Sequence, residues 1–468
     1  MSESFDVVII GGGPGGYAAA LYGAAAGLNV AMIERDKVGG TCLHRGCIPA
    51  KELLETAAVY RTVFEAKEFG VLVDQPGLDF SLTQARKQRI IDGLFKGLSG
   101  LLKQRKVTVI AGTGSLGPDN TVIVEAADGL LSQVHGEYVI LAAGSVPRTI
   151  PGFDRDGKFV LTSDEVLELQ KLPASVVVIG GGAIGCEFAS MMIDLGTSVT
   201  LLEGLPKILP GCDEDAATVV LRSFKRRGMT VLTGVAVTGH TPNEDGVTTT
   251  VHYGDGQSIV VNAVVVSVGR RPMTDNLVQP GSGVGISDRG HVEVDELCRT
   301  TAPKVYAIGD VIATPALAHI GFAEAILVIK HILGEPAMSI DYGKVPWCIY
   351  CNPEVAFAGY TEQGAIDAGY EVVVSKHKFA GNGRAMIVGA TDGLVKVIAE
   401  RKADGTGGKI LGVHMAGPWV TEQLGQAYLA VNWEATVDEV AAFIQPHPSM
   451  SELFGETVMS LTGRGLHG

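Results

Sequence analysis

Short apolar runs that lead directly into glycine recur along the chain and predict buried strands. Residues 7–10 (Val-Val-Ile-Ile) and 176–179 (Val-Val-Val-Ile) are each followed by three glycines, and residues 138–144 and 264–269 follow a similar plan. A run without polar alternation is typical of a strand that is covered on both faces. The pattern therefore predicts α/β units, in which the strands of a sheet alternate with covering helices.

The hydrophobic pattern changes from Val345 onward. Segments such as residues 355–359 and 394–398 alternate like strands, and helical segments follow them. Such a grouping of strands and helices is typical of an α+β domain. The last part of the chain is therefore expected to fold as a separate unit.

The first apolar run belongs to a unit that the chain repeats 169 positions later without a gap. Each copy has a strand, a G-x-G-x-x-G motif, a helix of small residues and a second strand that ends on glutamate, Glu34 in the first copy and Glu203 in the second. One such motif is weak evidence, but two complete copies predict two dinucleotide-binding sites. The motif glycines are Gly11, Gly13 and Gly16 in the first copy and Gly180, Gly182 and Gly185 in the second.

The three glycines of each motif are expected to have separate tasks. The first permits a tight turn, the second lets the backbone approach a pyrophosphate, and the third lets the helix pack on the strand. The pyrophosphate would lie at the helix N-terminus, where free N–H groups favour an anion, and the glutamates would accept a hydrogen bond from an adenosine ribose. The strand ends at Gly144 and Gly269 would close the two sites, and Asp310 would accept bonds from a ribityl chain.

Composition narrows the classes of protein that remain. At 468 residues the chain is long enough for about three domains. Its formal net charge of −14 disfavours nucleic-acid binding, which relies on basic residues that neutralise phosphates. No apolar run reaches the ~18 residues of a membrane-spanning helix, and the N-terminal sequence lacks the pattern of a secretory signal. We therefore expect a cytoplasmic protein.

Two of the seven cysteines, Cys42 and Cys47, follow the first repeat closely and are expected near the ligand of that site. From the residues alone, the pair is inert, forms a metal site together with His44, or forms a redox disulfide. A zinc site would need a fourth ligand at recognisable spacing, and no second cluster exists, so we expect no metal. A disulfide would need a distorted helix, because positions five apart on a regular helix are too widely separated, and Gly46 would permit the distortion.

Residues 39–51 (Gly-Gly-Thr-Cys-Leu-His-Arg-Gly-Cys-Ile-Pro-Ala-Lys) resemble the active-site signature of the FAD-containing pyridine nucleotide-disulfide oxidoreductases. The resemblance covers nearly the whole chain, is greatest to the dihydrolipoamide dehydrogenases, and includes Gly309-Asp310 and residues 447–452. It implies two Rossmann-like dinucleotide-binding domains, the first for FAD and the second for NAD, and a C-terminal α+β dimerisation domain. The implied segments are residues 1–150 for FAD and the redox disulfide, 151–272 for NAD, 273–344 for the return to the FAD or central domain, and 345–468 for dimerisation.

The resemblance also implies roles for individual side chains. Cys47 would lie against the flavin and form a thiolate-flavin charge-transfer pair, and Cys42 would exchange with a dithiol substrate. Lys51 would lie beside the flavin and pair with Glu187, and the alternative for these two is a plain ion pair on a helix surface.

His447 stands between two prolines, whose restricted backbone stiffens the segment, and Glu452 follows closely. The resemblance implies that His447 is the base for the substrate thiol and that a carboxylate such as Glu452 orients it. It also implies that this histidine crosses to the active site of the partner subunit in a homodimer.

Together these roles predict a dihydrolipoyl dehydrogenase, an enzyme that oxidises protein-bound dihydrolipoamide through the Cys42–Cys47 disulfide and FAD and passes hydride to NAD⁺. Its partners would be the lipoyl domains of 2-oxoacid dehydrogenase complexes or of the glycine cleavage system, and a docking role there is compatible with turnover. The alternative is another disulfide reductase of the family. A glutathione reductase would carry arginines near Glu203, however, and a mercuric reductase would carry a cysteine pair after Cys351.

Two stretches depart from the family pattern. His44-Arg45 stands where relatives often have Asn-Val, and Gln445 stands where they often have His. Arg45 would lower the pKa of a neighbouring thiol if it pointed inward, or it would be solvated, and Gln445 puts the hydrogen bonds around the base in doubt. Cys348 and Cys351 form a C-x-x-C whose strand spacing places them on opposite faces, and no role follows for them.

Overall fold

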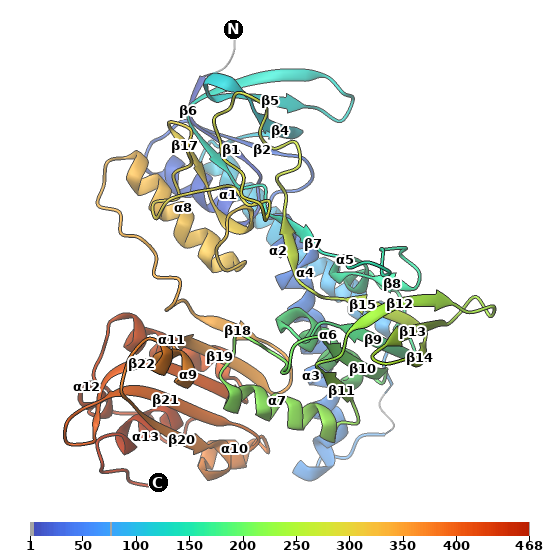
Figure 1. The fold of residues 1–468 in the computed structure, drawn as a ribbon, viewed down its shortest axis with the longest axis vertical. Helices are drawn as coiled ribbons and strands as arrows, with labels where there is room; N and C mark the ends of the chain where they lie inside the picture. Colours follow the sequence, from blue (N-terminus) through green and yellow to red (C-terminus); the bar gives the residue numbers. More distant parts are fainter. Residues whose placement is uncertain (1–3, 75–76, 468) are drawn as a thin grey trace.

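The chain folds into one upper and two lower lobes, seen in a computed structural model that describes residues 4–74 and 77–467 (Figure 1). The upper lobe contains the N-terminal strands and also the segment around residues 305–332, which returns to it after the lower right lobe. The lower left lobe is C-terminal. The predicted segment 1–150 begins on residues outside the described ranges, and the predicted segment 345–468 ends on one.

The upper lobe is built on a sheet with the strand order β3-β2-β1-β6-β5-β4, and β17 pairs with β6. Strands β3, β2, β1, β6 and β17 are parallel, and the side chains of residues 7–10 in β1 are almost fully buried because both faces of the sheet are covered. The strands are β1 Ser4–Ile10, β2 Val30–Glu34, β3 Thr108–Ala111, β4 Thr113–Leu116, β5 Thr121–Glu125, β6 Leu131–Leu141 and β17 Val305–Ala307. The helices are α1 Pro14–Ala25, α2 Gly40–Arg45, α3 Cys47–Glu65, α4 Phe80–Gln104 and α8 Ala318–Ile332, with 3-10 turns at Ala66–Phe69, Pro118–Asn120 and Gly309–Val311.

The lower right lobe repeats this plan in a sheet with the order β11-β10-β9-β15-β8, all of whose neighbours are parallel. The predicted repeat is confirmed: β1-α1-β2 ends at Glu34, and β9-α6-β10 ends at Glu203. A small antiparallel sheet, β12-β13-β14, projects from this lobe. The strands are β8 Val160–Leu161, β9 Ser175–Ile179, β10 Ser198–Glu203, β11 Thr230–Thr233, β12 Val237–Pro242, β13 Thr249–Tyr253, β14 Gln257–Val261 and β15 Ala263–Val266, and the helices are α5 Ser163–Leu167, α6 Ala183–Asp194 and α7 Glu214–Arg226.

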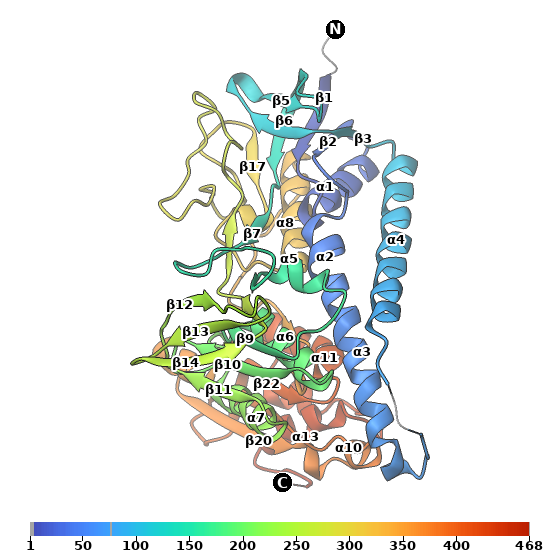
Figure 2. The same cartoon turned by 90° about the vertical axis from the view of Figure 1, so that its right-hand side faces the viewer.

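Two connections cross between the upper and lower right lobes side by side, as the antiparallel pair of β7 (Ser145–Pro147) and β16 (Arg270–Pro272). Helix α3 also leaves the upper lobe and runs down beside α6 (Figure 2). The buried face of α3, the lower right lobe and the first strands of the C-terminal lobe share one hydrophobic core. The lobes therefore meet through packed side chains as well as through covalent links.

The C-terminal lobe has the α+β arrangement that the sequence predicts. Its sheet has the order β18-β19-β22-β21-β20, with antiparallel neighbours throughout. The strands are β18 Trp347–Ile349, β19 Glu354–Gly359, β20 Val372–Lys378, β21 Leu394–Arg401 and β22 Gly407–Gly417; the helices are α9 Glu362–Asp367, α10 Gly383–Ile387, α11 Val420–Asn432, α12 Val437–Ala441 and α13 Glu452–Ser460, and a 3-10 turn spans Phe379–Gly381. Across the described residues of all three lobes, no helix is both long and apolar enough to cross a membrane.

Candidate active site

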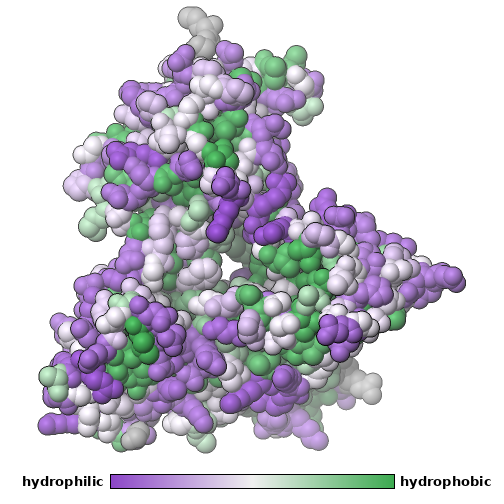
Figure 3. Space-filling view, in the orientation of Figure 1, coloured by the Kyte–Doolittle hydropathy of each residue, from purple (hydrophilic) through white to green (hydrophobic). Residues whose placement is uncertain are grey.

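A continuous cavity of about 1290 Å³ reaches both glycine-rich turns. In the space-filling view the molecule is hollowed where the lobes meet (Figure 3). His447, Glu452, Gly16 and Gly185 are not among the residues that line the cavity. The predicted residues that do line it are Gly11, Gly13, Glu34, Cys42, Cys47, Lys51, Gly144, Gly180, Gly182, Glu187, Glu203, Gly269 and Asp310.

The first glycine-rich turn has the geometry that a bound pyrophosphate requires. Gly11 has φ +107°, and a Cβ there would collide with the carbonyl oxygen of Ala142. A Cβ on Gly16 would collide with the carbonyl of Gly11, so the helix packs against the turn only because this residue is glycine. A Cβ on Gly13 would instead meet nothing within 4 Å, which leaves open space on the cavity side. The turn therefore fits a dinucleotide phosphate group.

The second turn reproduces these features. Gly180 has φ +102°, a Cβ on Gly185 would collide with the Gly180 carbonyl, and the Cβ position of Gly182 is open within 4 Å. Because Gly182 is followed immediately by helix α6, the open space also lies at a helix N-terminus, where an anion is favoured. The cavity therefore offers two matching phosphate cradles.

The two glutamates at the strand ends hold the glycine-rich turns. Glu34 Oε2 accepts a hydrogen bond from the Gly12 N–H at 2.7 Å, and Glu203 Oε2 accepts one from the Gly181 N–H at 2.5 Å. The second carboxylate oxygen of each accepts a backbone N–H two residues further along the chain, from Asp36 in one copy and Leu205 in the other. Each carboxylate oxygen has a further lone pair for a ribose hydroxyl. These carboxylates therefore have a structural task besides the predicted ligand contact.

The two cysteines lie on either side of a helix break, as the sequence predicts. Helix α2 contains Cys42 and ends at Arg45, α3 begins at Cys47, and Gly46 between them has φ −147° and ψ −113°. A Cβ on Gly46 would lie 3.0 Å from the Thr41 carbonyl oxygen, which is closer than ordinary van der Waals contact. Both sulfurs are free thiols in this structure.

The pKa values of the two thiols are shifted in opposite directions. A hydrogen bond from the Cys42 thiol and the positive charge of Lys51 lower the pKa of Cys47 to about 7, although burial and Glu187 oppose this. The same hydrogen bond to Cys47, together with burial, raises the pKa of Cys42 far above its usual range. The N-terminus of α3 also favours a negative charge at its first residue. Of the two sulfurs, Cys47 is therefore the one that ionises, and it is mostly thiolate above a pH of about 7 while Cys42 stays a thiol.

Lys51 and Glu187 form the predicted ion pair. The Lys51 Nζ lies 2.9 Å from both carboxylate oxygens of Glu187, and it lies over the ring of Tyr350 at 4.7 Å from the centroid. Glu187 is buried and also accepts the Tyr350 backbone N–H at 2.9 Å. Burial lowers the pKa of Lys51, but Glu187 more than offsets it and keeps the pKa above its usual value. A fixed positive charge therefore lies beside Cys47, and the alternative of a plain surface pair is wrong.

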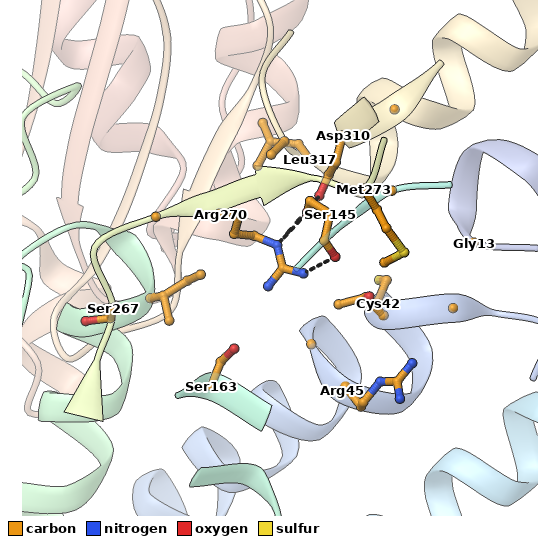
Figure 4. Close-up of a pocket in the computed structure, with 18 of the residues that line it drawn as sticks. Gly13, Cys42, Arg45, Ser145, Ser163, Ser267, Arg270, Met273, Asp310 and Leu317 are labelled. Atoms are coloured by element: carbon orange, nitrogen blue, oxygen red, sulfur yellow. Dashed lines mark hydrogen bonds and ion pairs between the residues drawn. The ribbon is translucent and has the colours of Figure 1, made fainter. Parts of the chain in front are cut away.

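Arg270 and Ser145 are site residues that the sequence analysis missed. Arg270 donates from Nε to the Ser145 hydroxyl at 2.7 Å, and that hydroxyl donates to Asp310 Oδ2 at 2.5 Å (Figure 4). Ser145 and Arg270 belong to the paired strands β7 and β16 that connect the lobes. The strand ends at Gly144 and Gly269 already marked this segment, but only the pairing of β7 with β16 brings the two side chains to Asp310.

His447 is exposed to solvent and lies outside the cavity of its own chain. Its side chain is 80% exposed, and its Nδ1 lies 3.0 Å from Glu452 Oε2. Glu452 is the first residue of α13, and its other carboxylate oxygen accepts a bond from Asn382. The predicted orienting pair is thus present, and the second ring nitrogen of His447 faces away from the carboxylate.

The departures from the family pattern at residues 44–45 and at Gln445 leave the Cys42–Cys47 pair and the contact between His447 and Glu452 intact. Arg45 forms an ion pair with Asp36 at 3.2 Å, and both side chains are about half exposed. Gln445 packs against Gly455 of α13, and its amide nitrogen is buried with no partner among the described residues. Cys348 lines the cavity next to Trp347, which the sequence did not indicate.

Comparison with known protein families gives matches over most of the chain. Residues 5–325 match the pyridine nucleotide-disulphide oxidoreductase family, and residues 345–458 match the dimerisation domain of that family. Among curated relatives, the dihydrolipoyl dehydrogenase of Bacillus subtilis is 40% identical over the full length of both chains. That of Zymomonas mobilis is 36% identical, again over the full length of both.

Solved structures with the same architecture include two relatives of lower identity. LpdA from Mycobacterium tuberculosis superposes with a TM-score of 0.91 at 26% identity, covering 97% of this chain and 99% of that one. The HOCl-induced flavoprotein disulfide reductase RclA from Escherichia coli superposes with a TM-score of 0.87 at 27% identity, covering 98% and 99%.

Proposed function

The chain belongs to the pyridine nucleotide-disulphide oxidoreductase family, and we propose that within this family it is a dihydrolipoyl dehydrogenase. It would oxidise the dihydrolipoyl group of a protein partner through the Cys42–Cys47 pair and FAD, and pass hydride to NAD⁺. The full-length identity to curated dihydrolipoyl dehydrogenases supports this activity.

One observation carries the proposal: a thiolate and a thiol lie at a helix break beside a fixed positive charge, inside a cavity that joins two phosphate cradles. Cys47 and Cys42 supply the sulfurs, and Lys51 supplies the charge. This arrangement would hold an anionic sulfur in a cavity that reaches both nucleotide sites. It suits the exchange of two electrons between a dithiol and a nucleotide.

The residues of the cavity fit both cofactors. The first turn, with Glu34, Asp310 and Lys51, would hold FAD, and the second turn, with Glu203, would hold NAD. Bound FAD would supply the two-electron carrier between the disulfide and NAD⁺. The protein itself supplies the sulfurs, the charge that stabilises a thiolate, and the surfaces that exclude water.

The substrate thiols would react with the disulfide form of the cysteine pair. A substrate thiolate attacks the Sγ of Cys42, the bond between Cys42 and Cys47 breaks, and Cys47 leaves as the thiolate. The second substrate thiol loses its proton to a base and attacks the mixed disulfide, which closes the substrate disulfide and releases Cys42. Cys42 then takes this proton from the base, because its raised pKa favours the thiol.

The base would be His447, held by Glu452 and supplied by the partner subunit. The match to the family dimerisation domain supports a homodimer. Because His447 is exposed and does not line the cavity of its own chain, its free ring nitrogen is available to a second copy. The active site would then be composite, with cysteines from one subunit and histidine from the other.

The rival within the family is a reductase for another disulfide. A carboxylate at Glu203 in the second turn disfavours the 2′-phosphate of NADP, which a glutathione reductase would use, and no cysteine follows Cys351. The test is steady-state turnover with dihydrolipoamide and NAD⁺, run beside glutathione disulfide with NADPH. Turnover only in the second assay would reject the proposal.

The protein partner would carry a lipoyl group, as in 2-oxoacid dehydrogenase complexes or the glycine cleavage system. Capture of the purified homodimer on immobilised lipoyl domains would test docking separately from turnover. We also propose a cytoplasmic location, because an odd number of cysteines, seven, in a long chain disfavours a disulfide framework.

Replacing Glu203 with alanine is expected to narrow the preference for NAD over NADP by roughly 1–3 kcal/mol, because the variant loses the ribose acceptor and the charge that repels a 2′-phosphate. The kcat/KM for NAD should also fall, because Glu203 holds the Gly181 N–H of the turn. The measurement is the ratio of kcat/KM for the two cofactors. Glu214→Ala, which removes an exposed carboxylate on helix α7, is the control and should keep the parent ratio. An unchanged ratio in Glu203→Ala would remove this residue from cofactor selection.

Long-wavelength charge-transfer absorbance of the two-electron-reduced protein is expected to rise as pH increases through about 7. Cys47 must be deprotonated to give this band, and its pKa is lowered from the ordinary 9.0 to about 7, so the band is lost below that pH. Lys51→Met should move the midpoint up by about 1 pH unit, because a positive charge that favours the thiolate is lost. An anaerobic pH titration measures this, with Lys67→Met, an exposed lysine in the 3-10 turn after α3, as the control. A midpoint that stays or falls in Lys51→Met would contradict the assignment.

A further inference from the structure

We infer that Lys396, in the C-terminal lobe, is a positioning residue for the nicotinamide nucleotide, because it anchors the loop that supports the second glycine-rich turn. The inference rests on the proposed function in one respect: it takes the second turn as the NAD site. It assigns to the C-terminal lobe a contribution to cofactor binding within the same chain.

Lys396 is a buried charge that is fully paired with residues of other elements. It lies in β21, and its side chain is only 2% exposed. Its Nζ lies 2.9 Å and 3.0 Å from the two carboxylate oxygens of Asp213, and 2.7 Å from one oxygen each of Asp215 and Glu362. A buried ammonium group is costly unless its partners stay in place. The pairing therefore fixes the position of Asp213 relative to the C-terminal sheet.

Asp213 lies at the end of the loop that connects strand β10 to helix α7. It caps helix α7 by accepting the Asp215 N–H at 3.1 Å, and its other carboxylate oxygen accepts the Glu362 N–H at 3.2 Å. The loop runs from Gly204 to Cys212, and its residues Gly204, Leu205 and Pro210 line the cavity. Anchoring Asp213 thus fixes the far end of a segment that forms part of the cavity wall.

The middle of this loop holds the glycine-rich turn directly. The Leu209 N–H donates to the Gly181 carbonyl oxygen at 2.7 Å, while the Gly181 N–H donates to Glu203. Both Leu209 and its neighbour Ile208 are buried, and a Cβ on Gly181 would lie 2.9 Å from the Ile208 side chain. Both backbone polar groups of Gly181 are therefore held by hydrogen bonds, and the loop supplies one of the two.

The first repeat clamps its turn in the same way but anchors the loop differently. There the Gly39 N–H donates to the Gly12 carbonyl oxygen at 2.8 Å, and the loop leads at once into α2. In the second repeat several residues separate the clamp at Leu209 from α7, and the helix start is tied by Lys396 to another lobe. In the first site the loop is fixed because it runs directly into a helix. In the second site the ion pair of Lys396 with Asp213 fixes the end of the loop.

The experiment compares Lys396→Met with Lys376→Met in the FAD-containing dimer. Lys376 is the cross-strand neighbour of Lys396; it contacts Asp215 at 3.1 Å, is about half exposed, and makes no contact with Asp213, so it is a matched control. We expect Lys396→Met to raise the KM for NAD⁺ and the Kd of ADP-ribose, measured by titration calorimetry, about tenfold or more, since small misplacements in a binding site have effects of this size. The KM for dihydrolipoamide and the charge-transfer band formed by dithiol should remain those of the parent.

Several results would overturn the inference. One is an ADP-ribose Kd in Lys396→Met that equals the Lys376→Met value, and another is an equal rise of both substrate KM values, which indicates general destabilisation. If Lys396→Met does not fold, Asp213→Asn replaces it, because asparagine keeps an oxygen for the helix cap and removes the charge that faces Lys396. The same selective rise in Kd then supports the inference, and its absence rejects it. Failure of the proposed function is distinct, because the parent protein itself would then lack turnover with dihydrolipoamide and NAD⁺.

Discussion

Replacing Cys47 with serine is expected to lower the rate of dihydrolipoamide oxidation by NAD⁺ by roughly 10³-fold or more, as removal of a reacting nucleophile does in other enzymes. No disulfide can form in this variant, and the sulfur with the lowered pKa is gone. Two-electron reduction should therefore give no long-wavelength charge-transfer band. The measurements are steady-state NADH formation and anaerobic absorbance spectra.

The companion variant, Cys42→Ser, should lose turnover equally but differ in its spectrum. Because no disulfide can form, Cys47 stays a thiol or thiolate, and the Lys51 charge still favours the thiolate. The charge-transfer band should be present without added reductant. Cys298→Ser is the control, since Cys298 is buried outside the cavity, and it should keep the parent spectrum and activity. Identical spectra for the Cys42 and Cys47 variants would reject the roles given to these two residues.

Replacing His447 with glutamine is expected to lower dithiol turnover roughly 10²–10⁴-fold, the usual contribution of a positioned acid or base. The cysteine pair and the charge-transfer band formed by a chemical reductant should be unaffected, because the Cys42 hydrogen bond and the Lys51 charge that lower the pKa of Cys47 both remain. The readouts are kcat with dihydrolipoamide and the spectrum after reduction. A variant with parental kcat would remove His447 from the reaction.

Mixed dimers test whether this histidine acts across the interface. Cys47→Ser chains and His447→Gln chains are combined after partial denaturation and reassembly. If the site is composite, each mixed dimer has one site with the cysteines of one chain and the histidine of the other, and activity well above both parents follows. Reassembly of each variant alone is the control. Activity no higher than in the parents, with mixed dimers shown to be present, would place the base within the same chain.

The parts of the site that the sequence could predict depend on local spacing. The glycine motifs, the glutamates at the strand ends and the helix break at Gly46 each follow from residues close together in the chain. Lys51 and Glu187 are far apart in sequence, and their pairing was available only through resemblance to the family. Physical reasoning from the residues thus predicted the two phosphate-binding turns and the distorted helix, while the resemblance to the family was needed to predict the redox roles of the side chains.

What the sequence could not indicate depends on contacts between distant segments. Arg270 and Ser145 meet because β7 and β16 pair, and the bond from Lys396 to Asp213 joins two lobes. Neither contact has a periodicity or a motif of its own. The orientation of Arg45 was also undetermined, because only the fold places Asp36 within reach of it. The contacts of such side chains can be predicted only when the packing of whole helices and strands is known.

The return of β17 to the upper sheet has a consequence for the order in which the protein is made. The partner of β17 is β6, and α8 packs against α1, so the first nucleotide unit receives its last strand and helix from residues 305–332. Those residues leave the ribosome only after the whole second unit, whose strands lie within residues 160–266. Domains generally fold as units during synthesis, and contacts between distant segments form late. The second nucleotide unit can therefore complete its sheet on the nascent chain while the first unit, although it starts first, still lacks its closing strand.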